Sequence, residues 1–131
     1  MKYLFFNYPN SICSSNCPSY LSEEVKKFWN SKKLCEVTNS IVAVHNGNIV
    51  GFFRFCLDFE SNDVYACGTY VLKDFRNQAI ATELWMKTIK KFKPKNVFVD
   101  TTSTEGKMFV RKIKKEFKNI KDTHDISDNW S

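Results

Sequence analysis

The sequence predicts an α+β (mixed α/β) fold, with one mostly antiparallel sheet flanked by helices. Three β-rich runs follow one another between residues 41 and 72, and from residue 81 the apolar residues take up a helical period. The chain has 131 residues, a length typical of one domain with one core, and no repeat or linker divides it. We therefore expect residues 1–131 to form a single domain.

The first part of the chain predicts a strand, a loop and a short helix. Residues 2–7 have strand character, which Pro9 ends, and the polar residues 10–19 are expected to form a loop. Ser22 can cap a helix because two glutamates follow it in the first turn, where the helix dipole favours acidic groups.

A hairpin is the clearest local signal. Residues 41–45 and 49–55 are β-rich runs on either side of Asn46-Gly47, a pair typical of two-residue hairpin turns. A third run, residues 64–72, follows a turn-like segment, so three antiparallel strands are expected. Alternation places Phe53, Phe55 and Leu57 on one face of the sheet.

The C-terminal half predicts two helices separated by a strand. Apolar residues at helical spacing run from Ala81 to Phe92, and Pro94 ends the pattern before a short buried strand at residues 97–99. Thr102 and Glu105 match a capping box that opens a second helix. The inner face of that helix would carry Phe109, Ile113 and Phe117.

The net charge of +6 is unevenly distributed. Residues 87–121 hold twelve basic and three acidic groups, a balance of +9, whereas the charges of residues 1–86 cancel. Positive charge concentrated in one segment attracts nucleic acid, an acidic protein or a polyphosphate cofactor. The alternative is a lysine-rich helix face that only contacts solvent.

Membrane and metal classes are not favoured. No apolar run approaches the roughly 18 residues of a membrane span, and the N-terminal run is too short for a signal-peptide core, so we expect a soluble, cytoplasmic protein. The five cysteines show no paired metal-ligand spacing. Buried or incidental thiols account for them better than a zinc site of Cys13, Cys17, Cys35 and His45, so no metal is expected.

The junction between the third run and the first C-terminal helix carries the chemistry. A helix N-terminus offers unpaired N–H groups and a partial positive charge, which bind phosphate oxygens. Small residues at positions 79 and 81 allow the main chain to approach a pyrophosphate, while Thr82 adds a hydroxyl and Arg76 a cation. An ordinary strand-to-helix connection is the alternative.

This junction resembles the acyl-CoA-binding motif of the GNAT N-acetyltransferase superfamily, Gln/Arg-x-x-Gly-x-Gly/Ala, which lies between a strand valine and an amphipathic helix. Arg76, Ala79 and Ala81 occupy the motif positions, with alanine for the usual glycine at 79, and Val71 matches the strand valine. The order of elements over residues 38–117 also follows the family. The resemblance implies a GNAT-like fold and an N-acetyltransferase with acetyl-CoA as co-substrate.

The resemblance also implies which residues hold acetyl-CoA. The main chain of one strand would bind the pantetheine arm, and an N–H of that strand would polarise the thioester carbonyl while the amine attacks. The implied cofactor-binding residues are Tyr70, Val71, Leu72, Arg76, Asn77, Gln78, Ala79, Ile80, Ala81 and Thr82.

Proton transfer has no clear carrier in the sequence. The histone acetyltransferase branch has a glutamate where this chain has Tyr65, and a tyrosine of many members would fall near Phe109 or Val110. Tyr65 and Ser103 are the catalytic candidates, and loss of the amine proton to water with no dedicated base remains open. Further candidates are Asp58, Glu60 and Tyr70.

The acceptor would be an amine on a protein or a small molecule, with residues 10–19 and the first helix on the acceptor side. Two other functions stay open. One is a non-catalytic acyl-CoA-binding or interaction module. The other, not favoured, is a nucleic-acid-associated protein that uses its basic C-terminal helices. The sequence assigns no oligomeric state.

Overall fold

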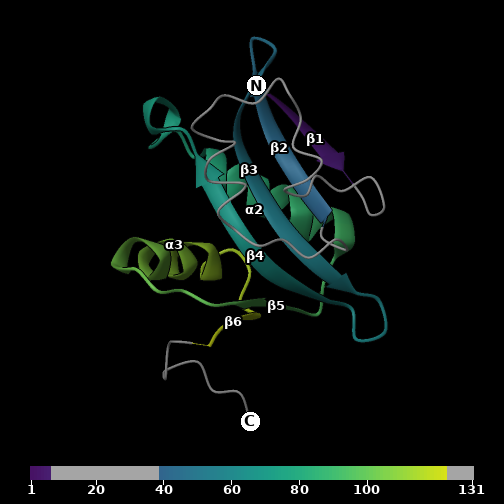
Figure 1. Cartoon of the computed structure of the whole chain (residues 1–131). Helices are drawn as coiled ribbons and strands as arrows, with labels where there is room; N and C mark the ends of the chain where they lie inside the picture. The colour runs from purple at the N-terminus through teal and green to yellow at the C-terminus, as the bar shows by residue number, and fades with distance from the viewer. Residues whose placement is uncertain (7–38, 124–131) are drawn as a thin grey trace.

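The computed structural model describes residues 1–6 and 39–123, which form one six-stranded sheet in the order β1-β2-β3-β4-β5-β6 with the helices α2 and α3 (Figure 1). This mixed α/β architecture is the predicted one. The predicted loop at residues 10–19, the helix that Ser22 would cap, and Cys13, Cys17 and Cys35 lie outside the described residues.

The first four strands are antiparallel neighbours. They are β1 (Lys2–Phe6), β2 (Asn39–His45), β3 (Asn48–Asp58) and β4 (Asp63–Val71). The β2–β3 turn has positive φ at both central residues, 51° at Asn46 and 80° at Gly47, as a two-residue hairpin turn of the right twist requires. The predicted hairpin is therefore confirmed.

The last two strands are parallel to their neighbours. β5 (Asn96–Val99) pairs with β4 only from Asp63↔Asn96 to Tyr65↔Phe98. Beyond that point β5 no longer pairs with β4, which continues over residues 66–71. β6 (Ile120–Asp122), which the sequence did not predict, pairs with β5 in parallel.

Helix α2 (Ile80–Phe92) crosses one face of β2, β3 and β4 (Figure 1). Its buried stripe meets the core face of β3, where the Trp85 ring stacks on Phe53 with centroids 4.7 Å apart. Phe55 is fully buried on the same face and Leu57 packs against this core, as alternation predicts. A short 3₁₀ turn, Lys73–Phe75, joins β4 to the loop before α2.

Helix α3 (Thr104–Lys114) contacts β6 and begins one residue later than predicted. The capping residue is Ser103, whose Oγ accepts a hydrogen bond from the Gly106 N–H at 3.0 Å, so the capping box at Thr102 and Glu105 is wrong. Phe109 is half-buried and Ile113 fully buried, as expected. Phe117 is also half-buried, but it lies beyond the end of the helix.

No helix in the described part of the chain is long and apolar enough to cross a membrane.

Candidate active site

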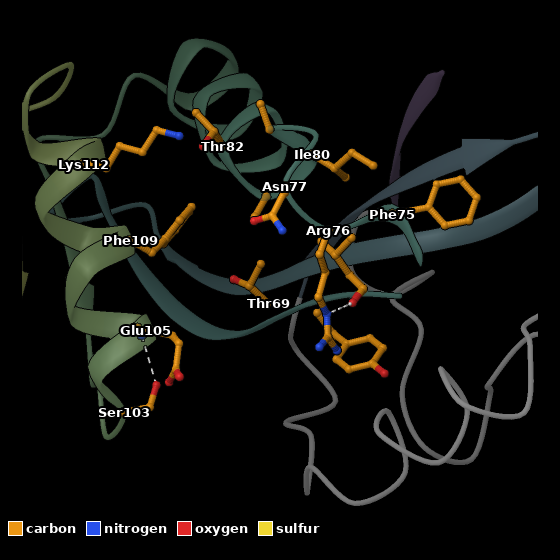
Figure 2. Close-up of a pocket in the computed structure, with 15 residues that line it drawn as sticks. Thr69, Phe75, Arg76, Asn77, Ile80, Thr82, Ser103, Glu105, Phe109 and Lys112 are labelled. Atoms are coloured by element: carbon orange, nitrogen blue, oxygen red, sulfur yellow. Dashed lines mark hydrogen bonds between the residues drawn. The ribbon is translucent and has the colours of Figure 1, made fainter. Parts of the chain in front are cut away.

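The divergence of β4 and β5 opens a groove along the outer edge of β4. An outer cavity of about 460 Å³ lies between the start of α2 and helix α3 (Figure 2), and an inner cavity of about 220 Å³ lies between β4 and the segment after β5. The two share Thr69, Ser103, Gly106 and Phe109, so we treat them as one groove. The groove leads from the N-terminus of α2 to the gap between β4 and β5.

Hydrogen-bond alternation decides which main-chain groups of β4 face this groove. The Leu72 N–H donates to the Val50 carbonyl at 2.8 Å, across the β3–β4 register. In an antiparallel pair the bonded positions alternate, so the polar main-chain groups of Thr69 and Val71 point away from β3 and toward the groove. Those of Tyr70 and Leu72 point toward β3. Of residues 70–72, to which the resemblance assigns pantetheine binding, only Val71 turns its polar main-chain groups toward the groove, as Thr69 also does.

The loop before α2 has an unusual backbone. Asn77 and Ala79 both adopt left-handed conformations, with φ of 65° and 60°. Main chain of this kind turns successive N–H groups toward one side and forms concavities that bind anions. Ala79 is also the N-cap of α2. The first N–H groups of a helix have no intrahelical partners, and the alanine side chain accepts no hydrogen bond from them. The helix dipole adds a partial positive charge at the same point.

Arg76 contacts the preceding strand, β4, instead of the start of α2. Its Nε donates to the Val71 carbonyl at 2.9 Å, and its guanidinium lies over the Tyr70 ring, 5.6 Å from the centroid. Figure 2 shows the side chain extended away from Thr82. Arg76 thus places a cation at the β4 end of the outer cavity and satisfies a carbonyl of the strand edge.

Lys112 supplies the cation on the other side. It lines the outer cavity, and Figure 2 shows its side chain reaching from α3 across the groove toward Thr82. Sequence reasoning missed this residue. The available signal was its spacing of three from Phe109, which places both on one side of a helix that lies in the +9 segment.

Most of the predicted cofactor-binding residues come together. The exceptions are Leu72 and Gln78, which do not line either cavity; the Gln78 side chain donates to the Asp74 carbonyl at 3.5 Å. The outer cavity is lined by Tyr70, Val71, Arg76, Asn77, Ala79, Ile80, Ala81 and Thr82.

The two predicted catalytic residues differ in placement. Ser103 lines both cavities, but its Oγ accepts the capping bond of α3. Tyr65 lines neither cavity, and its ring stacks on Phe98 of β5 with centroids 5.1 Å apart. It lies at the last paired position before the strands separate.

The acidic candidates at the end of β3 belong to a turn. The Asp58 carboxylate accepts hydrogen bonds from the N–H groups of Glu60 and Ser61 at 3.1 and 3.4 Å. Hydrogen bonds from Ser61 hold the pKa of Asp58 below its usual value. Neither Asp58 nor Glu60 lines the groove.

A different carboxylate lies in the inner cavity. Asp100 follows β5 directly, is exposed, and accepts a hydrogen bond from the Thr123 hydroxyl at 2.8 Å. The next residue, Thr101, is buried, and its N–H and hydroxyl both donate to the buried carboxylate of Asp122. The signal that could have identified Asp100 is its place at the carboxyl end of a parallel strand, where ligands bind in sheets of this kind.

Solved structures share this fold. A ribosomal-protein-alanine N-acetyltransferase from Brucella melitensis is 18% identical, with a TM-score of 0.52 over 67% of this chain and 70% of that one. An aminoglycoside acetyltransferase from an uncultured soil metagenomic sample, in complex with sisomicin, is 21% identical, with a TM-score of 0.54 over 70% and 64%. An aminoglycoside N-acetyltransferase in complex with CoA is 17% identical, with a TM-score of 0.50 over 71% and 75%.

The sequence itself matches a family model. No curated protein matches the chain significantly. The model of the acetyltransferase (GNAT) family, however, matches residues 6–107, which include β2 to β5, the loop before α2 and the start of α3. The chain therefore belongs to the acetyltransferase (GNAT) family, which confirms the resemblance, the fold class and the acetyltransferase assignment that the sequence predicts.

Proposed function

We propose that this protein transfers the acetyl group of acetyl-CoA to a primary amine, with the groove beside β4 as the acetyl-CoA site. The observation that carries the proposal is the separation of β5 from β4 after Tyr65, which leaves a groove beside residues 66–71 of β4. This edge starts at the inner cavity and ends at the left-handed loop before α2. A strand-like arm with an anionic end fits such a groove.

The residues present suit both ends of acetyl-CoA. The pyrophosphate would meet the first N–H groups of α2 and the hydroxyl of Thr82, with Lys112 opposite. The pantetheine amides would pair with the main chain of Thr69 and Val71, as an extended ligand adds to a sheet edge. The acetyl end would then lie in the inner cavity.

The reaction needs an electrophile, a nucleophile and a proton acceptor. The amine nitrogen attacks the thioester carbonyl, a C–N bond forms, and the C–S bond breaks to release CoA as a thiolate. Main-chain N–H groups of β4 at the inner cavity would stabilise the oxyanion. We assign the amine proton to Asp100, because it is the carboxylate that lines the inner cavity within the described residues. Ser103 would then cap α3, and Tyr65 would support the strands where they part.

The acceptor class is a cationic amine, because Asp100 places a negative charge at the inner cavity. Solved relatives that share the fold are named for two such acceptors, a ribosomal-protein alanine and aminoglycosides. The acceptor side that the sequence assigns to residues 10–19 and the first helix lies outside the described residues. A single domain in the cytoplasm is part of the same proposal.

Thermal unfolding of the full chain tests cofactor binding. Acetyl-CoA at 100 times its dissociation constant should raise the free energy of unfolding by about 2.7 kcal/mol. No change in melting temperature at millimolar acetyl-CoA would overturn the proposed function.

CoA release tests catalysis. Sisomicin and a peptide with an N-terminal alanine are the two acceptors to try first. Asp100→Asn should lower kcat by about 10²-fold or more with little change in acetyl-CoA affinity. Glu105→Gln, a change of the same kind in the outer cavity, is the matched control and should leave kcat unchanged. Binding of acetyl-CoA without release of CoA with any amine would instead support the non-catalytic module.

A further inference from the structure

Two thiols meet across β3 and β4. The Cys56 Sγ and the Cys67 Sγ lie 3.6 Å apart, although the residues are eleven positions apart in the chain. The contact depends on an irregularity in the pairing. Phe55 pairs with Ala66 and Arg54 pairs with Gly68, so Cys67 is an extra residue in β4, a β-bulge.

The geometry is close to that of a disulfide. A disulfide bond is about 2.05 Å long and joins residues whose Cβ atoms are usually about 3.5–4.5 Å apart, so the two sulfurs must approach by about 1.6 Å. Cys56 pairs with Tyr65, so Cys67 lies diagonally across from Cys56, and the bond needs side-chain rotation together with a shift of the bulge toward β3. Cys67 is exposed, so a solvent-borne oxidant can reach it, while Cys56 is half-buried beside it.

The position of Cys67 connects this pair to the groove. Ala66, Cys67 and Gly68 line the inner cavity and form the part of β4 that follows its separation from β5. Thr69 and Val71, whose main chain faces the groove, come next along the strand. A covalent bond from Cys67 to β3 would therefore act on the segment that presents the edge to a ligand.

We propose that Cys56 and Cys67 form an oxidisable dithiol, which closes to a disulfide by exchange with a small-molecule disulfide, and that this modification lowers the affinity of the groove for acetyl-CoA. The first half stands on the two thiols alone. The second half rests on the proposed function. The bond lowers affinity because it draws the bulge toward β3 and shifts the main chain at Thr69 away from its position beside the groove.

The exchange balances in two steps. The Cys67 thiolate attacks one sulfur of glutathione disulfide, and one glutathione leaves as a thiolate. The Cys56 thiolate then attacks the Cys67 sulfur of this mixed disulfide, and the second glutathione leaves. Two cysteine thiols are oxidised, one glutathione disulfide is reduced to two glutathione thiols, and the protons of the two cysteines pass to the two leaving thiolates.

Peptide mapping tests the modification. The full chain with Cys13, Cys17 and Cys35 changed to serine is equilibrated with glutathione disulfide and analysed by mass spectrometry. We expect one Cys56–Cys67 disulfide and a mass lower by two hydrogen atoms. The Cys56→Ser variant, the matched control, should stop at a glutathione adduct on Cys67. A stable adduct on Cys67, or unreacted thiols, in the protein that has both cysteines would overturn the proposal.

Calorimetry tests the consequence. Oxidation should weaken acetyl-CoA binding about tenfold or more, because the thioester end of the ligand would lie nearest Cys67. Reduction with dithiothreitol should restore the affinity. Adenosine 3′,5′-diphosphate, which carries only the nucleotide end, should bind both forms within about twofold. By linkage, saturating acetyl-CoA should raise the reduction potential of the pair by the same factor, about 30 mV for tenfold.

The outcomes separate the two hypotheses. Equal acetyl-CoA affinities of the reduced and oxidised proteins would overturn the effect on the groove. Failure of the reduced protein to bind acetyl-CoA would overturn the proposed function and, with it, the effect on affinity, while peptide mapping would still decide the disulfide.

Discussion

Ala79 occupies a backbone conformation that favours glycine. Its φ of 60° lies in the left-handed region, where a Cβ atom costs roughly 1–2 kcal/mol. Ala79→Gly should therefore increase the free energy of unfolding by about 1 kcal/mol, and acetyl-CoA affinity should be preserved or tighter. Denaturant unfolding and calorimetry measure the two quantities.

Ala81→Gly is the matched control for this change. Ala81 lies in the first turn of α2, where glycine costs up to about 1 kcal/mol, so the same substitution two positions further on should be destabilising. Equal losses of stability in both variants would contradict the left-handed conformation at Ala79.

Arg76 acts through its contacts with β4. Arg76→Ala removes the bond to the Val71 carbonyl and the contact with the Tyr70 ring, and it should weaken acetyl-CoA binding about tenfold, the 1–2 kcal/mol of a charge-assisted contact. Arg76→Lys keeps the charge but not the planar guanidinium, so it should recover little of the loss. Full recovery with lysine, measured by calorimetry, would mean that only the charge of Arg76 matters.

At the scale of elements, the start of α3 is the most testable feature. Ser103→Ala removes the N-cap and should lower the free energy of unfolding by about 1 kcal/mol, measured by denaturant unfolding. Ser103→Asn keeps a capping acceptor but no hydroxyl, so it should restore both stability and turnover. Restored stability with lost turnover would assign Ser103 a catalytic role instead.

The elements differ in how far the sequence could predict them. Asn46-Gly47 predicted its hairpin because both residues tolerate the positive φ that the turn needs. Three-residue β6 has no period to detect, and only its pairing with β5 makes it a strand. Thr102 and Ser103 are both suitable N-cap residues. Which of them caps α3 depends on the position and direction of the chain after β5, which are set by the tertiary structure.

The candidate site was predictable where one segment builds it and not where distant segments meet. The loop at residues 76–82 lies between one strand and one helix, so the motif located it. Asp100 and Lys112 reach the groove only because β5 and α3 lie beside β4, a tertiary effect. The orientation of Arg76 depends on which way the Val71 carbonyl points, and this follows from the β3–β4 register.

At the scale of the whole molecule, the net charge of +6 is the reason to consider nucleic-acid binding, and lysine variants test this alternative. Exposed lysines that do not line the groove, when changed together to glutamine, should leave acetyl-CoA affinity within about threefold, whereas Lys112→Gln alone should weaken it about three- to tenfold. Calorimetry measures both variants. The four lysines are Lys90, Lys95, Lys115 and Lys118.

Gel shifts with DNA and RNA complete this test. Loss of a salt-dependent nucleic-acid complex in the quadruple variant, together with unchanged acetyl-CoA affinity in Lys112→Gln, would favour the nucleic-acid alternative.

The separation of β5 from β4 has a second consequence, for colloidal behaviour. Residues 66–71 carry no charged side chain, and an uncharged open edge is a template on which strands of other molecules can add. A ligand strand in the groove would cover this template. Light scattering at 37 °C should therefore show slower aggregation with saturating acetyl-CoA than with adenosine 3′,5′-diphosphate at equal occupancy, because only the former covers the edge. Gly68→Lys, at a position where an added Cβ atom meets no other atom within 4 Å, puts a charge on this edge and should slow aggregation even without ligand.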